Sequence, residues 1–128
     1  MKIYTGTDII EVARIQKALE KTPGFKARVY TSAEQSYCES RGKGAYQSFA
    51  ARFAAKEAAS KALGCGIGVR FGLTECEIVN DSDTGAPRIY FTGKAKKRLE
   101  ELGITSVSVS LSHTDTLAMA AVTMIGKD

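Results

Sequence analysis

The sequence predicts an α+β fold: one small domain, residues 1–128, with a mixed or antiparallel sheet packed on a long helix. Strand and helix patterns are mixed along the chain without a regular βαβ repeat. A long helix is expected over residues 45–63, because Ala, Leu, Lys and Glu dominate its second half from Arg52 to Gly64. Residues 104–111 and 117–124 alternate small or polar with apolar side chains, as paired antiparallel strands do. A length of 128 residues is typical of one domain with a core of its own.

The first part of the chain predicts a strand and then a helix. Residues 2–8 are rich in β-branched side chains, and Gly6 within them marks a bulge or a close approach of two backbones. Residues 9–20 predict a helix, which Thr22-Pro23-Gly24 ends. Its apolar stripe consists of Ile9, Val12, Ile15 and Leu19, interrupted by Gln16.

The elements on either side of the long helix are predicted from turn and capping signals. Ser32-Ala33-Glu34-Gln35 has the form of a capping box and predicts a short helix that ends near Glu39. The elements expected after the long helix are a glycine-rich loop at 64–72, strands at 74–79 and 87–91 joined by a turn at 81–85, and a helix at 93–102 capped by Thr92.

Composition narrows the class of protein. No apolar run approaches the roughly 20 residues that cross a bilayer, and the N-terminus lacks the apolar segment of a signal peptide, so we expect a cytoplasmic protein without membrane contact. The three cysteines are widely spaced, and we expect them to be reduced packing residues. The net charge of +4 suggests an anionic partner. The densest basic cluster, Lys94 to Arg98, is typical of a solvated helix face, and no nucleic-acid-binding motif is present.

The segment from Arg52 to Gly64 is the most informative part of the chain. On a helix, Phe49, Phe53, Glu57 and Lys61 follow one another at a spacing of four and share a face. Glu57 and Lys61 could form an exposed pair that stabilises the helix by roughly 0.2–0.5 kcal/mol. If the face is buried, Glu57 instead needs a cation or a metal as partner.

Asp8 lies where the predicted first strand gives way to a helix, and two interpretations are open. Asp8-x-x-Glu11 is a variant of the capping box, so Asp8 could cap the helix. Alternatively, Asp8 and Glu57 converge on one divalent cation, because two carboxylates with waters and substrate oxygens are how Mg²⁺ is usually held beside phosphates.

His113 is the only histidine and lies at a predicted strand end, either as a hydrogen-bonded turn residue or as a ligand-binding one. A hydrolase triad of Ser112, His113 and Asp115 is disfavoured, because the chain has no Gly-x-Ser-x-Gly motif. The glycines from Gly64 to Gly68 follow a helix rather than precede one, so they indicate a helix C-cap or a place where a ligand approaches the backbone.

Three blocks of the sequence together resemble the holo-acyl-carrier-protein synthases, the small bacterial class of 4′-phosphopantetheinyl transferases. The blocks are Gly6-Thr7-Asp8-Ile9-Ile10-Glu11 with Arg14-Ile15, Arg52-Phe53-Ala54-Ala55-Lys56-Glu57-Ala58 with Lys61-Ala62 and Gly64, and Ser110-Leu111-Ser112-His113. Their order and spacing match over essentially the whole chain.

This resemblance implies the transfer of phosphopantetheine from coenzyme A to a serine of apo-acyl carrier protein, with release of adenosine 3′,5′-bisphosphate, in fatty acid biosynthesis. It also implies an α+β fold assembled as a homotrimer with active sites between subunits. The catalytic residues would be Asp8, Glu57 and Lys61, with Asp8 and Glu57 as Mg²⁺ ligands. The residues that would bind coenzyme A are Arg52, Lys61, Gly64, Gly66 and His113. Arg14 would contact an acidic helix of the carrier protein.

Two other functions remain open from the residues alone. A non-catalytic basic module would bind nucleic acid or an acidic protein in a strongly salt-dependent way. A magnesium-dependent phosphohydrolase or nuclease would use the same two carboxylates without a carrier protein. Coenzyme A binding distinguishes them, since only the transferase requires it.

Overall fold

The long helix α4 (Ala45–Ala62) is the centre of the fold, and the computed structural model describes all residues 1–128 around it. The other elements are β1 (Lys2–Glu11), α1 (Val12–Lys21), α2 (Phe25–Val29), α3 (Ser32–Glu39), the 3₁₀ turns η1 (Gly42–Gly44) and η2 (Leu73–Glu75), β2 (Cys76–Asn80), β3 (Pro87–Phe91), α5 (Gly93–Glu101), β4 (Ile104–His113) and β5 (Leu117–Gly126).

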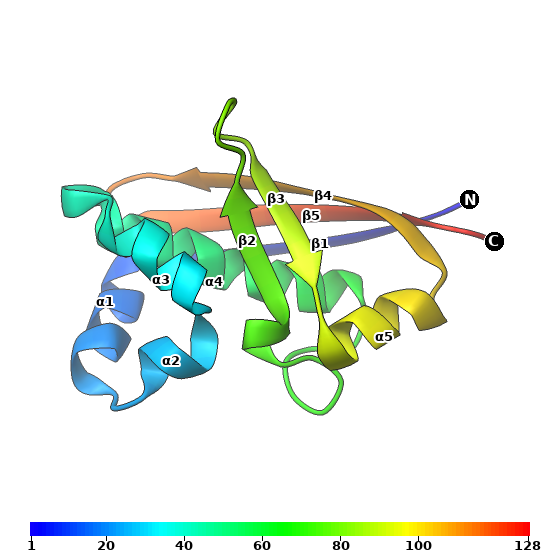
Figure 1. The fold of residues 1–128 in the computed structure, drawn as a ribbon, viewed down its shortest axis with the longest axis horizontal. Helices are drawn as coiled ribbons and strands as arrows, with labels where there is room; N and C mark the ends of the chain where they lie inside the picture. Colours follow the sequence, from blue (N-terminus) through cyan, green and yellow to red (C-terminus); the bar gives the residue numbers. More distant parts are fainter.

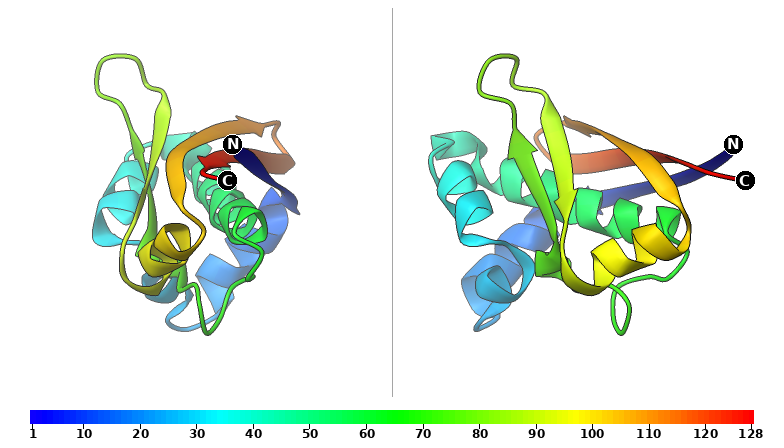
Figure 2. Two further views of the ribbon diagram at one scale, coloured as in Figure 1. Left: turned by 90° about the vertical axis from the view of Figure 1, so that its right-hand side faces the viewer. Right: turned by 45° about the vertical axis from the view of Figure 1, so that its right-hand side comes forward.

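The strands form two sheets, and both are wholly antiparallel. One has the order β1-β5-β4, and the other is the β2–β3 hairpin. Figure 1 shows α4 lying lengthwise along the three-stranded sheet, with the hairpin crossing on its other side and both chain termini at one end. The end-on view in Figure 2 shows α4 enclosed between sheet and hairpin. The predicted α+β fold in one small domain is therefore confirmed.

Alanine allows α4 to be enclosed in this way. Its buried alanines are Ala50, Ala51, Ala54, Ala55, Ala58, Ala59 and Ala62. Alanine has the highest helix propensity and a small side chain, so the helix is locally stable and thin enough to have neighbours on several sides. On the sheet, α4 meets further small residues, among them Gly6, Ala118 and Ala120.

Gly6 marks the closest approach between sheet and helix. A Cβ atom at Gly6 would lie 1.9 Å from the carbonyl oxygen of Ala58 and 2.8 Å from the amide nitrogen of Ala62. The pairing of β1 with β5 runs without a bulge through this position. A bulge and a close approach of two backbones were both predicted for Gly6, and the structure shows the close approach.

The outer face of the three-stranded sheet, which points away from α4, carries large apolar side chains that remain exposed. They are Ile3, Ile9, Leu117, Met119 and Ile125, and Ile3 and Ile9 are 63% and 62% exposed. In the strand register Ile3 pairs with Ile125 and Ile9 with Met119, so these side chains lie on one surface.

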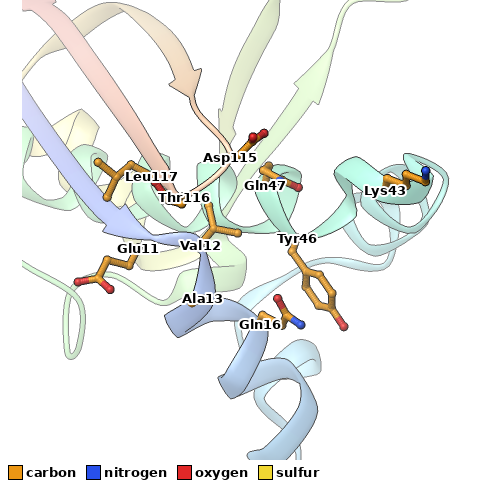
Figure 3. A pocket seen from close by; sticks show the side chains of 10 residues that line it. All are labelled: Glu11, Val12, Ala13, Gln16, Lys43, Tyr46, Gln47, Asp115, Thr116 and Leu117. Atoms are coloured by element: carbon orange, nitrogen blue, oxygen red, sulfur yellow. The ribbon is translucent and has the colours of Figure 1, made fainter.

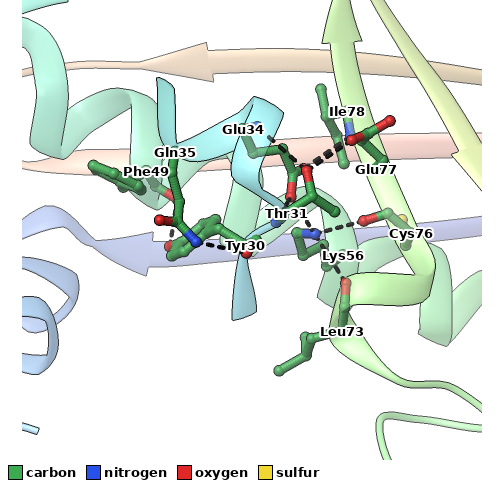
Figure 4. A network of polar contacts seen from close by, with 10 residues as sticks. All are labelled: Tyr30, Thr31, Glu34, Gln35, Phe49, Lys56, Leu73, Cys76, Glu77 and Ile78. Atoms are coloured by element: carbon green, nitrogen blue, oxygen red, sulfur yellow. Dashed lines mark hydrogen bonds and ion pairs between the residues drawn. The ribbon is translucent and has the colours of Figure 1, made fainter. Parts of the chain in front are cut away.

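A buried ion pair links the helices to the hairpin (Figure 4). Lys56 on α4 donates to Glu34 on α3 at 2.8 Å, and both side chains are fully buried. Lys56 also donates to the carbonyl oxygens of Leu73 and Cys76, while Glu34 accepts from the amide of Ile78 at 2.9 Å. Every charged atom of the pair thus has a partner, which is what burial of a charge requires.

Three local predictions were wrong. The first strand continues to Glu11 rather than ending at residue 8, because β5 pairs with it as far as Leu117, and Ile9 is therefore exposed on a strand. The capping box of α3 uses Thr31 and Glu34, one residue earlier than predicted. Thr92 precedes α5 without a side-chain capping hydrogen bond.

The helix α2 was not predicted. It has only five residues, and sequence periodicity cannot reveal so short an element. Tertiary packing holds it in place, because the Phe25 ring lies 6.2 Å from that of Phe53 and 6.3 Å from that of Tyr30.

The cysteines match their predicted role as reduced residues. Cys38 and Cys76 are buried, Cys65 is half-buried, and none forms a disulfide. Burial raises the pKa of the Cys76 thiol to about 12. None of the helices has both the length and the apolar character needed to traverse a lipid bilayer.

We expect Gly6→Ala to destabilise the fold by about 1–3 kcal/mol or more, since β1 must move away from α4 to make room for the methyl group. The free energy of unfolding in urea measures this loss. Gly44→Ala is the control, because Gly44 has a φ of −89° and no atom within 4 Å of an added Cβ. An unchanged stability of Gly6→Ala would show that β1 can shift freely.

We expect Glu34→Gln to cost about 3–5 kcal/mol, since it leaves the Lys56 ammonium buried without a countercharge. Glu39→Gln, in the exposed pair with Lys26, is the control and should cost at most about 1 kcal/mol. In a double-mutant cycle, Glu34→Gln with Lys56→Met should lose less stability than the two single losses added together. Simple additivity would contradict a dependence of each charge on the other.

Candidate functional site

Asp8, Glu57 and Lys61 lie together at the surface between β1 and α4. Asp8 lies on the same face of β1 as the buried Gly6 and Ile10, so its side chain points toward α4. The Lys61 ammonium is 3.1 Å from Asp8 Oδ1 and donates to the carbonyl oxygen of Thr7 at 3.0 Å. The three predicted catalytic residues are thus neighbours in space, although Asp8 is far from the other two in sequence.

The electrostatics of this group suit a divalent cation. Burial raises the pKa of the Glu57 carboxyl, and the neighbouring Asp8 carboxylate raises it further, whereas Lys61 and Arg14 lower it. The Asp8 carboxylate therefore disfavours the charged form of Glu57, and a bound cation would relieve that repulsion. No group of three or more His, Cys, Asp or Glu side chains converges anywhere in the structure. A pair of carboxylates fits Mg²⁺, which rarely uses an all-protein cage and takes its remaining ligands from water and phosphate oxygens.

Arg52 and His113 lie in a second group, which we call the arginine pocket. It is a hollow of about 360 Å³ whose lining includes Tyr37, Arg41, Arg52, Asn80 and His113, and no carboxylate lines it. Arg52 comes from α4, and His113 is the last residue of β4. The pocket therefore concentrates positive charge at the surface.

Arg52 is buried without a countercharge. Only 2% of it is exposed. One terminal guanidinium nitrogen, Nη2, donates to Asn80 Oδ1 at 2.6 Å and the other, Nη1, to Ser48 Oγ at 3.4 Å, while Nε has no partner. A buried guanidinium without a carboxylate is unfavourable unless an anion binds to it, so the pocket has the chemistry of an anion site.

The two groups face different sides of the molecule. Arg52 and Glu57 are five residues apart on α4, which places them about 140° apart around the helix axis. Asp8 and His113 lie on the two outer strands of the sheet, and β5 separates them by on the order of 10 Å. A single chain therefore holds these predicted site residues in two separate groups, which we call half-sites.

Arg14 lies on the first turn of α1, close enough to Glu57 to lower its pKa. It is exposed, as are Lys17 and Lys21, which follow at helical spacing on the same face of α1. A basic stripe thus runs from the carboxylate group along the outside of α1.

Comparison with known proteins decides between the classes of function. The sequence profile of the 4′-phosphopantetheinyl transferase superfamily matches residues 4–121, nearly the whole chain. The chain belongs to this superfamily. The predicted resemblance and the predicted class of transferase are therefore confirmed.

Individual relatives agree in sequence and in fold. The holo-[acyl-carrier-protein] synthase of Ruminiclostridium cellulolyticum is 51% identical over 121 residues, which cover 94% of this chain and 90% of the relative. The crystal structure of the Helicobacter pylori synthase in complex with coenzyme A is 33% identical, with a TM-score of 0.82 over 94% of this chain and 99% of that one. The Bacillus anthracis synthase, in complex with CoA (3′,5′-ADP), is 34% identical, with a TM-score of 0.80 over 97% and 96%.

The glycine-rich loop of this transferase caps α4. The amides of Gly64, Cys65 and Gly66 donate to the carbonyl oxygens of Lys61 and Ser60, as expected at a helix C-terminus. Arg98 on α5 donates to the Leu63 carbonyl at 3.1 Å, so part of the basic cluster predicted to be a solvated face has a structural role. The loop begins three residues after Lys61, next to the carboxylate group.

Several alternatives considered for the sequence are wrong. Asp8 is not a helix cap, because it lies within β1 and the residue before α1 is Glu11. Lys61 pairs with Asp8 rather than with Glu57. His113 contacts the carbonyl of its neighbour Thr114 at 3.4 Å and forms no hydrogen bond with Ser112 or Asp115, as a hydrolase triad would require.

Sequence reasoning missed Tyr37, Arg41 and Asn80 in the arginine pocket. They come from α3, the turn after it and the end of β2, and only tertiary structure brings them to Arg52. The run Arg41-Gly42-Lys43-Gly44 was a weak signal, since a basic glycine loop before a long helix is also typical of a solvated turn.

A larger hollow contains none of the predicted site residues (Figure 3). It measures about 570 Å³ and lies where the start of α1, the start of α4 and the β4–β5 turn meet. Its lining consists of Glu11, Val12, Ala13, Gln16, Lys43, Tyr46, Gln47, Asp115, Thr116 and Leu117. The size of a hollow alone therefore does not locate the site in this fold.

Proposed function

We propose that this enzyme transfers 4′-phosphopantetheine from coenzyme A to a serine hydroxyl of apo-acyl carrier protein, releases adenosine 3′,5′-bisphosphate, and serves fatty acid biosynthesis in the cytoplasm. The observation that carries the proposal is the meeting of Asp8, Glu57 and Lys61 in a member of this transferase family. Relatives that are named holo-[acyl-carrier-protein] synthase, two of them in complexes with coenzyme A or 3′,5′-ADP, support it.

The reaction exchanges one phosphorus–oxygen bond for another. The serine oxygen attacks the phosphorus that carries pantetheine, the bond from that phosphorus to the bridging oxygen of the pyrophosphate breaks, and the serine proton passes to the Glu57 carboxylate or to water. Negative charge grows on the departing phosphate, so catalysis depends on alignment and on positive charge near it.

Asp8 and Glu57 would hold Mg²⁺, which when bound supplies positive charge to the phosphates. The Lys61 ammonium lies beside these carboxylates and would pair with a phosphate oxygen when the substrate binds. Because the Lys61 side chain is 54% exposed, it is free to change partner from Asp8 to the phosphate.

Arg52 and His113 would bind another phosphate of coenzyme A through the arginine pocket, and the backbone at Gly64 and Gly66 would lie along the nucleotide. The support is the burial of the Arg52 guanidinium without a countercharge and the absence of a carboxylate in the pocket lining.

We propose that the two half-sites are completed by assembly as a homotrimer. Two independent features support it: the half-sites of one chain face different sides, and the outer sheet face exposes large apolar side chains such as Ile3 and Ile9. Exposed apolar surface of this kind is typical of a protein–protein interface. In the trimer, Asp8, Glu57 and Lys61 of one subunit would meet Arg52 and His113 of a neighbour.

The basic stripe of α1 would bind the carrier protein. Arg14, Lys17 and Lys21 present positive charge beside the carboxylate group, and carrier proteins are acidic. Complementary charge speeds encounter and would bring the carrier serine next to the half-site that carries Glu57.

We expect the wild-type protein to add one phosphopantetheine to an apo-acyl carrier protein in the presence of coenzyme A and Mg²⁺, as measured by intact mass. A chelator should prevent the gain. Glu57→Gln should lower turnover by about 100-fold or more, because it removes a carboxylate from the cation site. Glu101→Gln, an exposed change of equal charge on α5, is the control. No mass gain with a carrier that a known synthase modifies would overturn the proposed function.

We also expect two inactive variants to restore activity when they assemble together. Glu57→Gln and His113→Ala damage different half-sites, so coexpressed chains form some intersubunit sites with both halves intact. Random assembly gives about a quarter of the wild-type number of sites. Each variant alone should stay inactive under the same assay. Failure of the mixture, with mixed oligomers verified by affinity tags, would contradict a site shared between subunits.

A further inference from the structure

Two guanidinium groups share one aromatic ring in the arginine pocket. The Cζ atom of Arg52 lies 4.3 Å from the centre of the Tyr37 ring, and the Cζ atom of Arg41 lies 5.4 Å from it. Both distances are within the range of a cation–π interaction. Tyr37 lies in the last turn of α3 and Arg41 four residues later, whereas Arg52 comes from α4.

The Tyr37 ring offsets part of the electrostatic repulsion between the two guanidinium groups in the pocket. Arg41 and Arg52 carry like charges, neither forms an ion pair with a carboxylate, and Arg52 is almost fully buried. The negative face of an aromatic ring attracts a cation without neutralising it, unlike a carboxylate. Tyr37 therefore stabilises two cations in place and leaves their charge available to a ligand.

A carboxylate at this position would defeat anion binding, because it would satisfy the guanidinium groups permanently. The hydrogen-bond partners of Arg52, Asn80 and Ser48, are also neutral, and its buried Nε has no partner. The neutral side chains around Arg52 thus orient its guanidinium without neutralising its charge.

We propose that Tyr37 is a positioning residue for substrate binding: its ring holds Arg41 and Arg52 together as a preformed platform for a phosphate group of the substrate. Arg41 becomes a direct phosphate-binding residue in this arrangement, and Tyr37 acts through the two arginines. The inference rests on the proposed function for the identity of the substrate, coenzyme A. A platform ordered before binding costs less entropy when the phosphate arrives, so the benefit appears as affinity.

The test compares a variant that keeps the ring with one that removes it. Tyr37→Phe retains the aromatic face, and Tyr37→Leu replaces it with an apolar side chain of no π character. We expect Tyr37→Leu to weaken coenzyme A binding about tenfold, in calorimetric Kd and in KM, because the cation–π contact of a buried cation such as Arg52 is of this strength. The value of kcat and the KM for the carrier protein should change little. Tyr37→Phe should bind coenzyme A like the wild type.

A double-mutant cycle separates this role from a general loss of structure. Arg41 is exposed, so Arg41→Met should leave the unfolding midpoint unchanged while weakening coenzyme A. If Tyr37 acts through Arg41, Arg41→Met should cost less affinity in the Tyr37→Leu background than in the wild type. Unchanged coenzyme A affinity in Tyr37→Leu, equal damage from Phe and Leu, or fully additive losses would each overturn the proposal.

The failure of this proposal is distinct from that of the proposed function. If the wild-type protein modifies the carrier and Tyr37→Leu binds coenzyme A as tightly as the wild type, only the proposed role of Tyr37 is refuted. A wild-type protein that binds no coenzyme A refutes the proposed function and the positioning role together.

Discussion

The buried ion pair between Lys56 and Glu34 is the interaction on which the rest of the structure depends. Taking both charges out of water is costly, so the pair is stable only while all its hydrogen bonds are made. Those hydrogen bonds connect α3, α4, η2 and β2 through one pair of side chains. The helix α4 is consequently held in one rotation about its axis, with Lys56 facing the hairpin.

That rotation sets the position of both half-sites. Arg52 is four residues before Lys56, on the same side of α4, and so reaches Asn80 at the end of β2. Glu57 and Lys61 are one and five residues after Lys56, on a different side of α4, and Lys61 reaches Asp8 on β1. One buried pair thereby orients two groups of charged side chains that do not touch one another.

Small residues set the second constraint, which is the short distance between β1 and α4. Lys61 reaches Asp8 because β1 approaches the backbone of α4 at Gly6, where no side chain intervenes. Because α4 packs against the inner face of the sheet, the large apolar side chains of the outer face, such as Ile3 and Ile9, stay exposed. A thin central helix therefore explains both the closeness of the carboxylate group and the surface that we propose for assembly.

The sequence by itself determined the fold class, most of the elements and the candidate chemistry. The blocks around Asp8, Glu57 and His113 indicated the transferase class only through their resemblance to a known family, because patterns of charge, glycine and periodicity by themselves left other classes of function open. The sequence could not reveal α2, the end of β1 or the residues of the α3 capping box, since these depend on strand pairing and packing between distant segments. Nor could it place Lys56 opposite Glu34, or Tyr37 beneath Arg41 and Arg52. Only the tertiary structure decided that the predicted site residues lie in two separate groups, because the way α4 is rotated between sheet and hairpin is set by contacts between segments far apart in the chain.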